Sequence, residues 1–328
     1  MLHNAGGEIS LHALLRRLQD QGHDCIALVA ETTDVPSYHL DGVEVVTTSS
    51  PREAKAAPFE YFQWADVCLT QLTSSYRAGL LGRMTGTPVV HYAHNDGSYT
   101  ARMLATQSDA AIYNTEWVRR SCQEQGAWTP GEILHPVVDP AEYATDGERR
   151  YVTLINLSTG EDNHYDKGQA TFFELARRNP TMEFLGVRGA YGVQGYVDLP
   201  NVSYLDHTDD ITSVYAQTRV LLVPSKYESY GRVAVEAAAS GIPSICTPTP
   251  GLVEAMGDAA LYADYGNYDS WNAQLYAAYW RKRLICGEPL QRSAFLYSQS
   301  QQELADVELM FQIIHEGGLQ DYYNFKDV

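Results

Sequence analysis

The fold of this 328-residue chain is decided by the stretch Val220–Glu254, VLLVPSKYESYGRVAVEAAASGIPSICTPTPGLVE. An apolar, β-branched run opens the stretch and predicts a buried parallel strand that Pro224 closes. A polar loop containing a glycine follows, and then a small-residue helix over 233–240 that Gly241 ends. A second short strand completes a βαβ unit. In open α/β sheets, ligands bind at loops of this kind, at the carboxyl ends of the strands.

Two carboxylates lie inside this unit. Glu228 is in the loop, and Glu236 is on the following helix, whose turns point it back toward the loop. Carboxylates accept hydrogen bonds from sugar hydroxyls, and backbone N–H groups at a helix start favour an anion. These N–H groups would be those of Ser229, Tyr230, Gly231 and Arg232. The spacing alone leaves a second interpretation open, a helix N-terminus with a favourable Glu and a solvated second Glu.

The stretch resembles the donor-binding region of retaining glycosyltransferases of the GT-B fold, in the large group-1 (GT4-like) family that uses nucleotide-activated sugars. The family's hallmark is a pair of Glu residues with seven residues between them, preceded by Pro-Ser and enclosing a Gly and an Ala-rich helix. The matching residues here are Pro224-Ser225, Glu228, Gly231, Glu236 to Ala239, Gly241-Ile242-Pro243, Gly251 and Glu254.

The resemblance covers nearly the whole chain and implies an α/β architecture, two Rossmann-like doubly wound domains that face each other across a cleft. The length also fits two domains of about 150 residues. We predict an N-terminal, acceptor-side domain over 1–147, a nucleotide-sugar donor domain over 148–298, and a helix over 299–328 that crosses back to the first domain. One departure from the family is the strand that normally precedes the glycine loop, because no residues remain for it.

The bulk composition restricts the partners. Lys and Arg number 23 against 41 Asp and Glu, a formal net charge of −18. This charge disfavours duplex nucleic acid, whose binding depends on Lys and Arg. The apolar runs are too short for a transmembrane segment, and the first residues lack the layout of a signal peptide. The five cysteines are scattered and odd in number, which favours free thiols in a reducing compartment and a cytoplasmic location.

Two features of the first domain have functional candidates. Gly6-Gly7 precedes a helix predicted from about Glu8, and its position matches the family's glycine loop, which faces donor and acceptor. The strand ending at Ala93 leads into His94, which best matches the family's histidine that reaches the donor sugar. His91, inside that strand, is predicted to be structural.

The resemblance also implies cations that neutralise the donor diphosphate. Lys167, before Gly168 at a predicted helix start, matches the family's lysine. A cation there is unfavourable for the positive helix terminus unless an anion binds. The family's arginine position holds Asn156 or a neighbour, and Arg188, after the next strand, is the candidate replacement.

These observations predict a retaining glycosyltransferase that moves a sugar from a nucleotide-diphosphate sugar to an acceptor hydroxyl of a glycan, protein, lipid or small molecule. His94, Glu228 and Lys167 are the catalytic candidates, and Glu236 would hold the ribose hydroxyls. No Asp-x-Asp motif is present, so neither a metal nor another cofactor is implied. Two alternatives stay open, a catalytically impaired GT-B protein that binds nucleotide-sugars as a partner subunit, and a nucleotide-sugar epimerase.

Overall fold

The structure is a computed structural model. It describes residues 6–29, 37–47, 57–158, 166–189, 194–280, 287–317, 319–320 and 322. The chain forms two compact units, which we call the N-terminal unit (Gly6–Val137 with Ser300–Val328) and the central unit (Val138–Gln299). The predicted boundary at residue 147 therefore differs from the observed one, since contacts place 138–147 with the central unit. The predicted lack of a strand before Gly6 falls on residues outside this description.

The central unit is built on one parallel sheet of six strands in the order β10-β9-β8-β11-β12-β13. Counted along the chain this order is 3-2-1-4-5-6, the doubly wound arrangement of dinucleotide-binding folds. The direction of winding reverses between β8 and β11, so the loops that follow these two strands diverge there. The strands are β8 (Tyr151–Ile155), β9 (Phe184–Val187), β10 (Val202–Leu205), β11 (Thr218–Val223), β12 (Ser244–Cys246) and β13 (Ala260–Tyr262).

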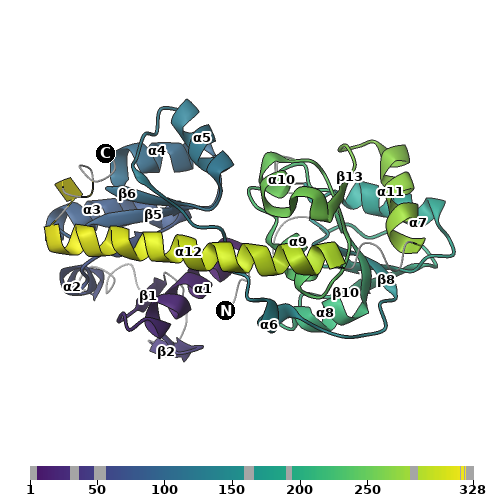
Figure 1. Ribbon diagram of the computed structural model, residues 1–328, viewed down its shortest axis with the longest axis horizontal. Coiled ribbons are helices and arrows are strands. Elements are labelled where there is room, and N and C mark those ends of the chain that lie inside the picture. Colours follow the sequence, from purple (N-terminus) through teal and green to yellow (C-terminus); the bar gives the residue numbers. More distant parts are fainter. Residues whose placement is uncertain are drawn as a thin grey trace. The chain divides into compact units, whose positions relative to one another are not determined.

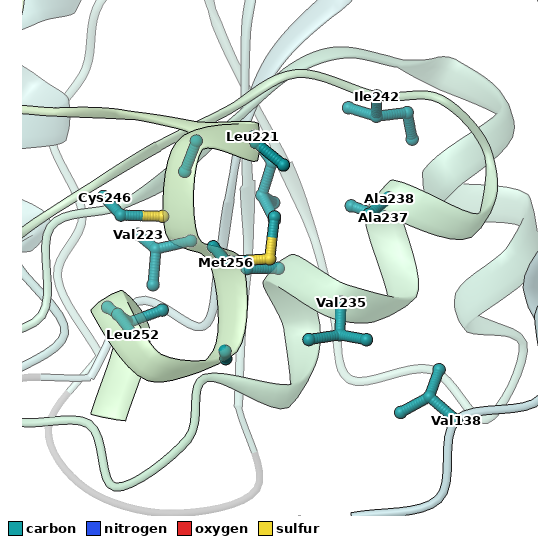
Figure 2. Close-up of a cluster of buried hydrophobic side chains, with 14 of the residues drawn as sticks. Val138, Leu221, Val223, Val235, Ala237, Ala238, Ile242, Cys246, Leu252 and Met256 are labelled. Carbon is teal, nitrogen blue, oxygen red and sulfur yellow. The ribbon is translucent and has the colours of Figure 1, made fainter. Parts of the chain in front are cut away.

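Strand β11 is buried on both faces, as its continuous apolar sequence predicts. Leu221 and Val223 contribute to one core cluster, which contains Leu252 and Met256 and is drawn in Figure 2. Val220 and Leu222 belong to a second cluster, which contains Phe172 and Trp271. Because successive side chains of a strand point to opposite faces, the two clusters lie on opposite sides of the sheet. Full burial of each such large side chain contributes about 1.5–3 kcal/mol.

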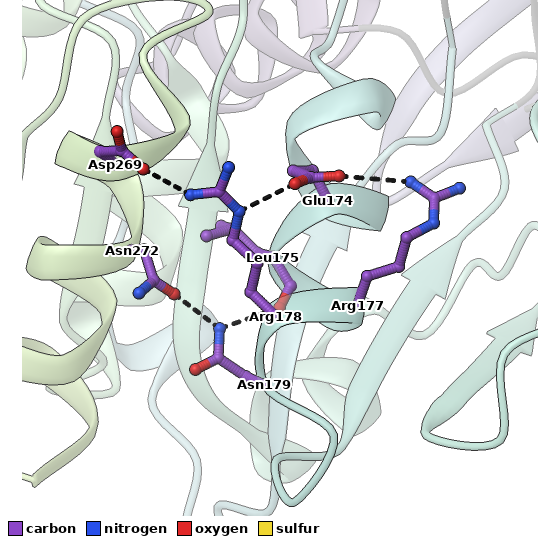
Figure 3. A network of polar contacts seen from close by, with 7 residues as sticks. All are labelled: Glu174, Leu175, Arg177, Arg178, Asn179, Asp269 and Asn272. Atoms are coloured by element: carbon purple, nitrogen blue, oxygen red, sulfur yellow. Dashed lines mark hydrogen bonds and ion pairs between the residues drawn. The ribbon is translucent and has the colours of Figure 1, made fainter.

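Helices cover both faces of this sheet. Helices α7 and α11 carry large side chains of the second cluster, among them Phe172 and Trp271, and are joined by polar contacts, which Figure 3 shows. In these contacts Arg178 bonds Glu174 of its own helix and Asp269 of α11, and Asn179 bonds Asn272. Exposed ion pairs of this kind add little, so the apolar cluster holds the two helices together. The helices are α6 (Pro140–Tyr143), α7 (Gln169–Arg178), α8 (Ile211–Gln217), α9 (Arg232–Ala239), α10 (Pro250–Met256), the 3-10 turn η3 (Gly257–Ala259) and α11 (Tyr268–Trp280).

The N-terminal unit contains a parallel four-stranded sheet, β4-β5-β6-β7, and a three-stranded sheet, β1-β3-β2, in which β2 is antiparallel to β3. Strands β5 and β6 are buried along their whole length. The strands of this unit are β1 (Ile26–Val29), β2 (Ser37–Leu40), β3 (Val43–Thr47), β4 (Cys68–Thr70), β5 (Val89–Ala93), β6 (Ala110–Tyr113) and β7 (Gly131–Ile133). Figure 1 labels β1, β2, β5 and β6.

The first helix begins earlier than predicted, at Gly6, so Gly6 and Gly7 form its first turn and not a separate turn before it. Thr115 caps α5, since its hydroxyl accepts a hydrogen bond from the backbone N–H of Val118. The helices of this unit are α1 (Gly6–Asp20), α2 (Ala57–Trp64), the 3-10 turn η2 (Leu72–Ser74), α3 (Ser75–Thr85), α4 (Ser98–Gln107) and α5 (Glu116–Glu124).

The long helix α12 (Gly287–Gly317) contributes residues to both units (Figure 1). Within the N-terminal unit its Glu303 accepts hydrogen bonds from the backbone N–H of His135 and is 2.7 Å from that residue's Nδ1. Within the central unit its Tyr297 hydroxyl donates to Asp139, which also caps α6. His135 and Asp139 thus each bond α12 within their own unit.

Candidate functional site

The point where the winding of the central sheet reverses brings two loops together. One loop follows β8 and leads to α7, and the other follows β11 and leads to α9. Ligands of doubly wound sheets bind at this position, because diverging loops leave a crevice at the carboxyl ends of the strands. Lys167 belongs to the first loop and Glu228 to the second. Two of the predicted donor residues of this unit, Lys167 and Glu228, therefore lie where the topology favours a ligand.

Lys167 is held by the residues on either side of it. The carboxylate of Asp166 accepts hydrogen bonds from the backbone N–H of Gly168, at 2.8 Å, and from the Tyr265 hydroxyl, at 2.7 Å. Its backbone carbonyl accepts another from the N–H of Lys226 in the second loop, also at 2.8 Å. Asp166 is buried, so these bonds fix the backbone on which the Lys167 side chain stands.

A glycine is required immediately after this lysine. Gly168 has a φ of +80°, and a Cβ atom there would lie 2.3 Å from the carbonyl oxygen of Pro224. Only glycine combines this backbone conformation with such a close approach. The two loops therefore touch through their backbones beside Lys167.

Glu228 receives two donors on one oxygen. Its Oε1 is 2.6 Å from Lys167 Nζ and accepts a 2.8 Å hydrogen bond from the Ser225 hydroxyl. The side chains of Lys167 and Glu228 are 27% and 14% exposed, so the ion pair is accessible at one side and sheltered at the other. A ligand phosphate could bind the lysine, and ligand hydroxyls could donate to the carboxylate.

The backbone between Glu228 and α9 is shaped by two close approaches. Gly231 caps α9 with a φ of +86°, and a Cβ atom there would lie 2.2 Å from a methyl group of Leu252. Gly251 lies against Ser229, where a Cβ atom would be 2.3 Å from the backbone oxygen. Tyr230 is 3% exposed and packs in the core. Any ligand contact of Tyr230 must therefore come from its backbone.

Glu236 is buried, with both carboxylate oxygens hydrogen-bonded inside the unit. Oε1 accepts from Arg232 Nε at 2.6 Å, and Oε2 accepts from the Tyr215 hydroxyl at 2.7 Å. Arg232 Nη2 also donates to the Tyr143 hydroxyl at 2.9 Å. Burial and then the Glu236 charge raise the pKa of Tyr215 well above its usual value, so this hydroxyl stays a donor. The guanidinium of Arg232 thus points at Glu236 and Tyr143. That Glu236 contacts the ribose of a donor stays a prediction.

Arg188 follows β9 directly, beside the residue that follows the paired strand β8. Ile155 and Val187 are register partners, which places Asn156 and Arg188 next to each other along the sheet edge. Arg188 Nη1 is 3.1 Å from Asp206 Oδ1, and both side chains are well exposed. That Arg188 replaces the family's arginine in neutralising the donor diphosphate stays a prediction.

In the N-terminal unit, the predicted residues Gly7 and His94 lie in contact. A Cβ atom at Gly7 would be 3.3 Å from His94 Cδ2, whereas one at Gly6 would meet nothing within 4 Å. The His94 ring packs at 4.1 Å from the Tyr92 ring, and its backbone carbonyl accepts from the Asn114 side chain. His91 is buried in β5, and burial lowers its pKa to about 4, so its ring is neutral at pH 7. This burial agrees with the predicted structural role of His91.

Several residues of these sites were not predicted from the sequence. Asp166, Tyr215 and Tyr143 carry no local signal, because their partners lie far away along the chain. In the described part of the chain, no cluster of three or more His, Cys, Asp or Glu side chains could hold a metal ion. None of the described helices combines the length and the apolar character needed to cross a membrane.

Comparison with known proteins gives this site a context. Residues 176–279 match the family model for group 1 glycosyl transferases. D-inositol 3-phosphate glycosyltransferase of Nocardiopsis dassonvillei is 24% identical over 241 residues, which is 62% of this chain and 56% of that protein. O-antigen chain mannosyltransferase B of Escherichia coli is 34% identical over 76 residues, 23% of this chain and 20% of that protein. The chain thus spans little more than half the length of these relatives at most.

Solved structures share the fold over almost the whole chain. Anabaena HepE in complex with UDP-glucose superimposes with a TM-score of 0.74 at 16% identity, covering 94% of this chain and 96% of that one. Sucrose-phosphate synthase from Thermosynechococcus elongatus gives a TM-score of 0.75 at 15% identity, covering 94% of each chain. At these identities the likeness shows the fold alone. The predicted α/β GT-B fold is therefore confirmed. The match of residues 176–279 bears out the predicted resemblance to group-1 glycosyltransferases.

Proposed function

Because residues 176–279 match the group 1 glycosyl transferase family and the chain has the GT-B fold, we propose that this protein is a glycosyltransferase. It transfers a sugar from a nucleotide-diphosphate sugar to an acceptor hydroxyl. The resemblance further supports the GT4-like subgroup and retention of the anomeric configuration. Four of the five cysteines are free thiols in the described residues, which supports a cytoplasmic location.

The observation that carries the proposal is the ion pair between Lys167 Nζ and Glu228 Oε1, 2.6 Å apart at the point where the sheet winding reverses. A donor of this class presents a diphosphate and a sugar with free hydroxyls. Lys167 would bind the diphosphate, and Glu228 would accept from the sugar hydroxyls. Arg188 would add a second cation, and the N–H groups of Ser229, Tyr230, Gly231 and Arg232 would meet the remaining anionic oxygens.

The chemistry needs stabilisation of a leaving diphosphate while positive charge develops on the sugar. The bond between the anomeric carbon and the phosphate oxygen breaks, and the acceptor oxygen forms a bond to the same carbon on the same face. The acceptor proton passes to the departing phosphate. Lys167 offsets the charge that grows on that phosphate, which is the largest contribution such a site makes to catalysis. No step in this scheme requires a divalent ion or another cofactor.

The N-terminal unit would serve the sugar and the acceptor. Gly6 and Gly7 are the first residues of α1, and Gly7 lies against the His94 ring. His94 would donate to a sugar hydroxyl, and the glycines would let the ligand approach the backbone. The acceptor is proposed only as a hydroxyl of a glycan, protein, lipid or small molecule. Duplex nucleic acid is disfavoured by the net charge of −18.

The first test is calorimetric titration of the protein with UDP, GDP and ADP. The second is titration with UDP-glucose and the matching GDP- and ADP-sugars, together with an assay for hydrolysis of these nucleotide-sugars. One nucleotide should bind, and Lys167→Ala and Glu236→Ala should weaken that binding. Lys226→Ala is the matched control, because Lys226 lies in the adjacent loop with its side chain exposed. Absence of binding to all three nucleotides would contradict the proposal.

The same experiment separates the two alternatives. A binding subunit would bind a nucleotide-sugar without turnover, and Glu228→Ala would then leave its biological effect unchanged. An epimerase would convert the sugar of the donor without any acceptor. The proposed transferase consumes the donor and releases the nucleoside diphosphate, and Glu228→Ala abolishes this release.

A further inference from the structure

The central unit contains a buried polar network that ends on the predicted ribose ligand Glu236. Tyr215 and Arg232 each donate to a different oxygen of this carboxylate, at 2.7 and 2.6 Å. Tyr143 accepts from the other side of the Arg232 guanidinium at 2.9 Å. Tyr215 is fully buried, and Arg232 and Glu236 are 9% and 5% exposed. The network therefore lies at the edge of the core and is almost entirely protected from water.

The geometry restricts how Glu236 can bind anything else. A carboxylate offers about four lone-pair positions, and Arg232 and Tyr215 occupy one on each oxygen. The carboxylate can then no longer rotate freely, and its remaining positions have a fixed direction. Glu236 also needs the charge of Arg232, because a buried carboxylate without an oppositely charged partner destabilises the folded protein.

The arginine is itself held in place. Burial lowers the pKa of Arg232, but the charge of Glu236 and the hydrogen bonds to Glu236 and the Tyr143 hydroxyl outweigh this effect and leave the pKa above its usual value. The segment that carries Tyr143 is tied down by the Ser240 hydroxyl, which donates to the Tyr143 carbonyl at 2.8 Å. Arg149 donates to the Tyr215 carbonyl at 2.6 Å and to the Ser240 carbonyl at 3.0 Å. Each of the two donors to Glu236 is thus anchored independently of any ligand.

We propose that Tyr215 and Arg232 are positioning residues that orient the Glu236 carboxylate, and that through it they make the protein select ribonucleotide over deoxyribonucleotide donors. This inference rests on the proposed function and on the predicted contact of Glu236 with the ribose hydroxyls of the donor. Tyr143 acts on Glu236 only indirectly, since its hydroxyl contacts Arg232 and not Glu236. Arg232 is thereby assigned a role through Glu236 in place of a side-chain contact with the donor.

The test compares the affinities of UDP, GDP and ADP with those of their 2′-deoxy and 3′-deoxy counterparts, by calorimetry. The variants are Tyr215→Phe, which removes only the hydroxyl, and Arg232→Lys, which keeps the charge but loses the planar fork. Glu236→Gln is the reference for a lost carboxylate. Tyr262→Phe is the matched control, because its partly buried hydroxyl donates to the Gly257 carbonyl in the same unit and has no hydrogen bond to Glu236 among the described contacts.

The wild-type protein should bind one ribonucleotide about 10- to 100-fold more tightly than a deoxy form of it, as expected for one charge-assisted hydrogen bond. Tyr215→Phe and Arg232→Lys should reduce this ratio to within about threefold of unity. Tyr143→Phe should reduce it less, and Tyr262→Phe should preserve it. A merely structural role would lower thermal stability and weaken both nucleotide forms equally, without changing the ratio.

The outcomes separate the inference from the proposed function. Wild-type protein that binds none of the three nucleotides contradicts the proposed function. Wild-type protein that binds a nucleotide without preferring ribose overturns both the inference and the ribose contact of Glu236, while the proposed transferase activity stands. A Tyr215→Phe variant that binds with an unchanged ratio overturns the inference alone. Tyr215→Phe keeps the test decisive even if Arg232→Lys does not fold.

Discussion

Lys167 Nζ and Glu228 Oε1 lie 2.6 Å apart although the two residues are 61 positions apart in the chain. They meet because β8 and β11 are neighbours at the centre of the sheet, so the loops that follow these strands start side by side. Ser225 donates to the same carboxylate oxygen. A diphosphate that binds Lys167 would therefore either share the lysine with Glu228 or replace Glu228 as its partner.

Replacing Lys167 separates its effect on catalysis from its effect on stability. We expect Lys167→Ala to lower kcat/KM about 100- to 1,000-fold, because the cation acts on charge that develops in the transition state. The free energy of unfolding should change by less than about 1 kcal/mol, since partly exposed ion pairs contribute little. Steady-state kinetics and urea titration measure the two quantities, with Lys226→Ala as control. Equal activity in both variants would exclude the assigned role.

The glycine pair at the start of α1 offers a matched comparison for His94. A methyl group at Gly7 would lie 3.3 Å from the His94 ring, and one at Gly6 would meet nothing. Both Gly6→Ala and Gly7→Ala should leave stability unchanged or raise it by up to about 1 kcal/mol, because alanine favours a helix. Gly7→Ala should reduce turnover more than Gly6→Ala, because it also displaces the His94 ring. Thermal melts and initial rates test this, and an equal loss of rate in Gly6→Ala would count against it.

Gly231 is expected to be essential for the stability of the central unit. Gly231→Ala adds the strain of a left-handed residue to an overlap with Leu252, and we expect a loss of about 2–5 kcal/mol. Gly266→Ala is the control, since Gly266 has a φ of +77° but open space around it. It should lose only about 1–2 kcal/mol. Denaturant unfolding gives both values, and similar losses would show that Leu252 moves aside.

The buried His91 predicts a pH dependence of stability. Its pKa falls from 6.5 to about 4 in the folded protein because burial disfavours the charged ring. Between these values the unfolded chain binds more protons than the folded one, so the free energy of unfolding decreases as the pH is lowered from 6.5 toward 4.

The loss from this one group amounts to about 3 kcal/mol. His91→Leu should remove this component, which appears as a difference in slope between variant and wild type in urea titrations at several pH values. Parallel slopes would show that His91 does not titrate in this way.

Much of the fold follows from local sequence patterns. The helix predicted over 233–240 forms as Arg232–Ala239, with each end shifted by one residue, because glycines on both sides mark its ends. The strand Ser37–Leu40 was not predicted, since it is mostly polar and pairs only through β3. Helix α4 was also not predicted.

Sequence alone determined which residues could form the candidate site. The spacing of Glu228 and Glu236 across a loop and a helix is a local property, and so is the glycine that caps α9. Only the tertiary structure decided what these side chains touch. The partners of Glu228 and Arg232 include residues 61 and 89 positions away, and the order of the strands brings them close. Local spacing carries no information on such contacts, because they arise from the packing of elements that are distant in the chain.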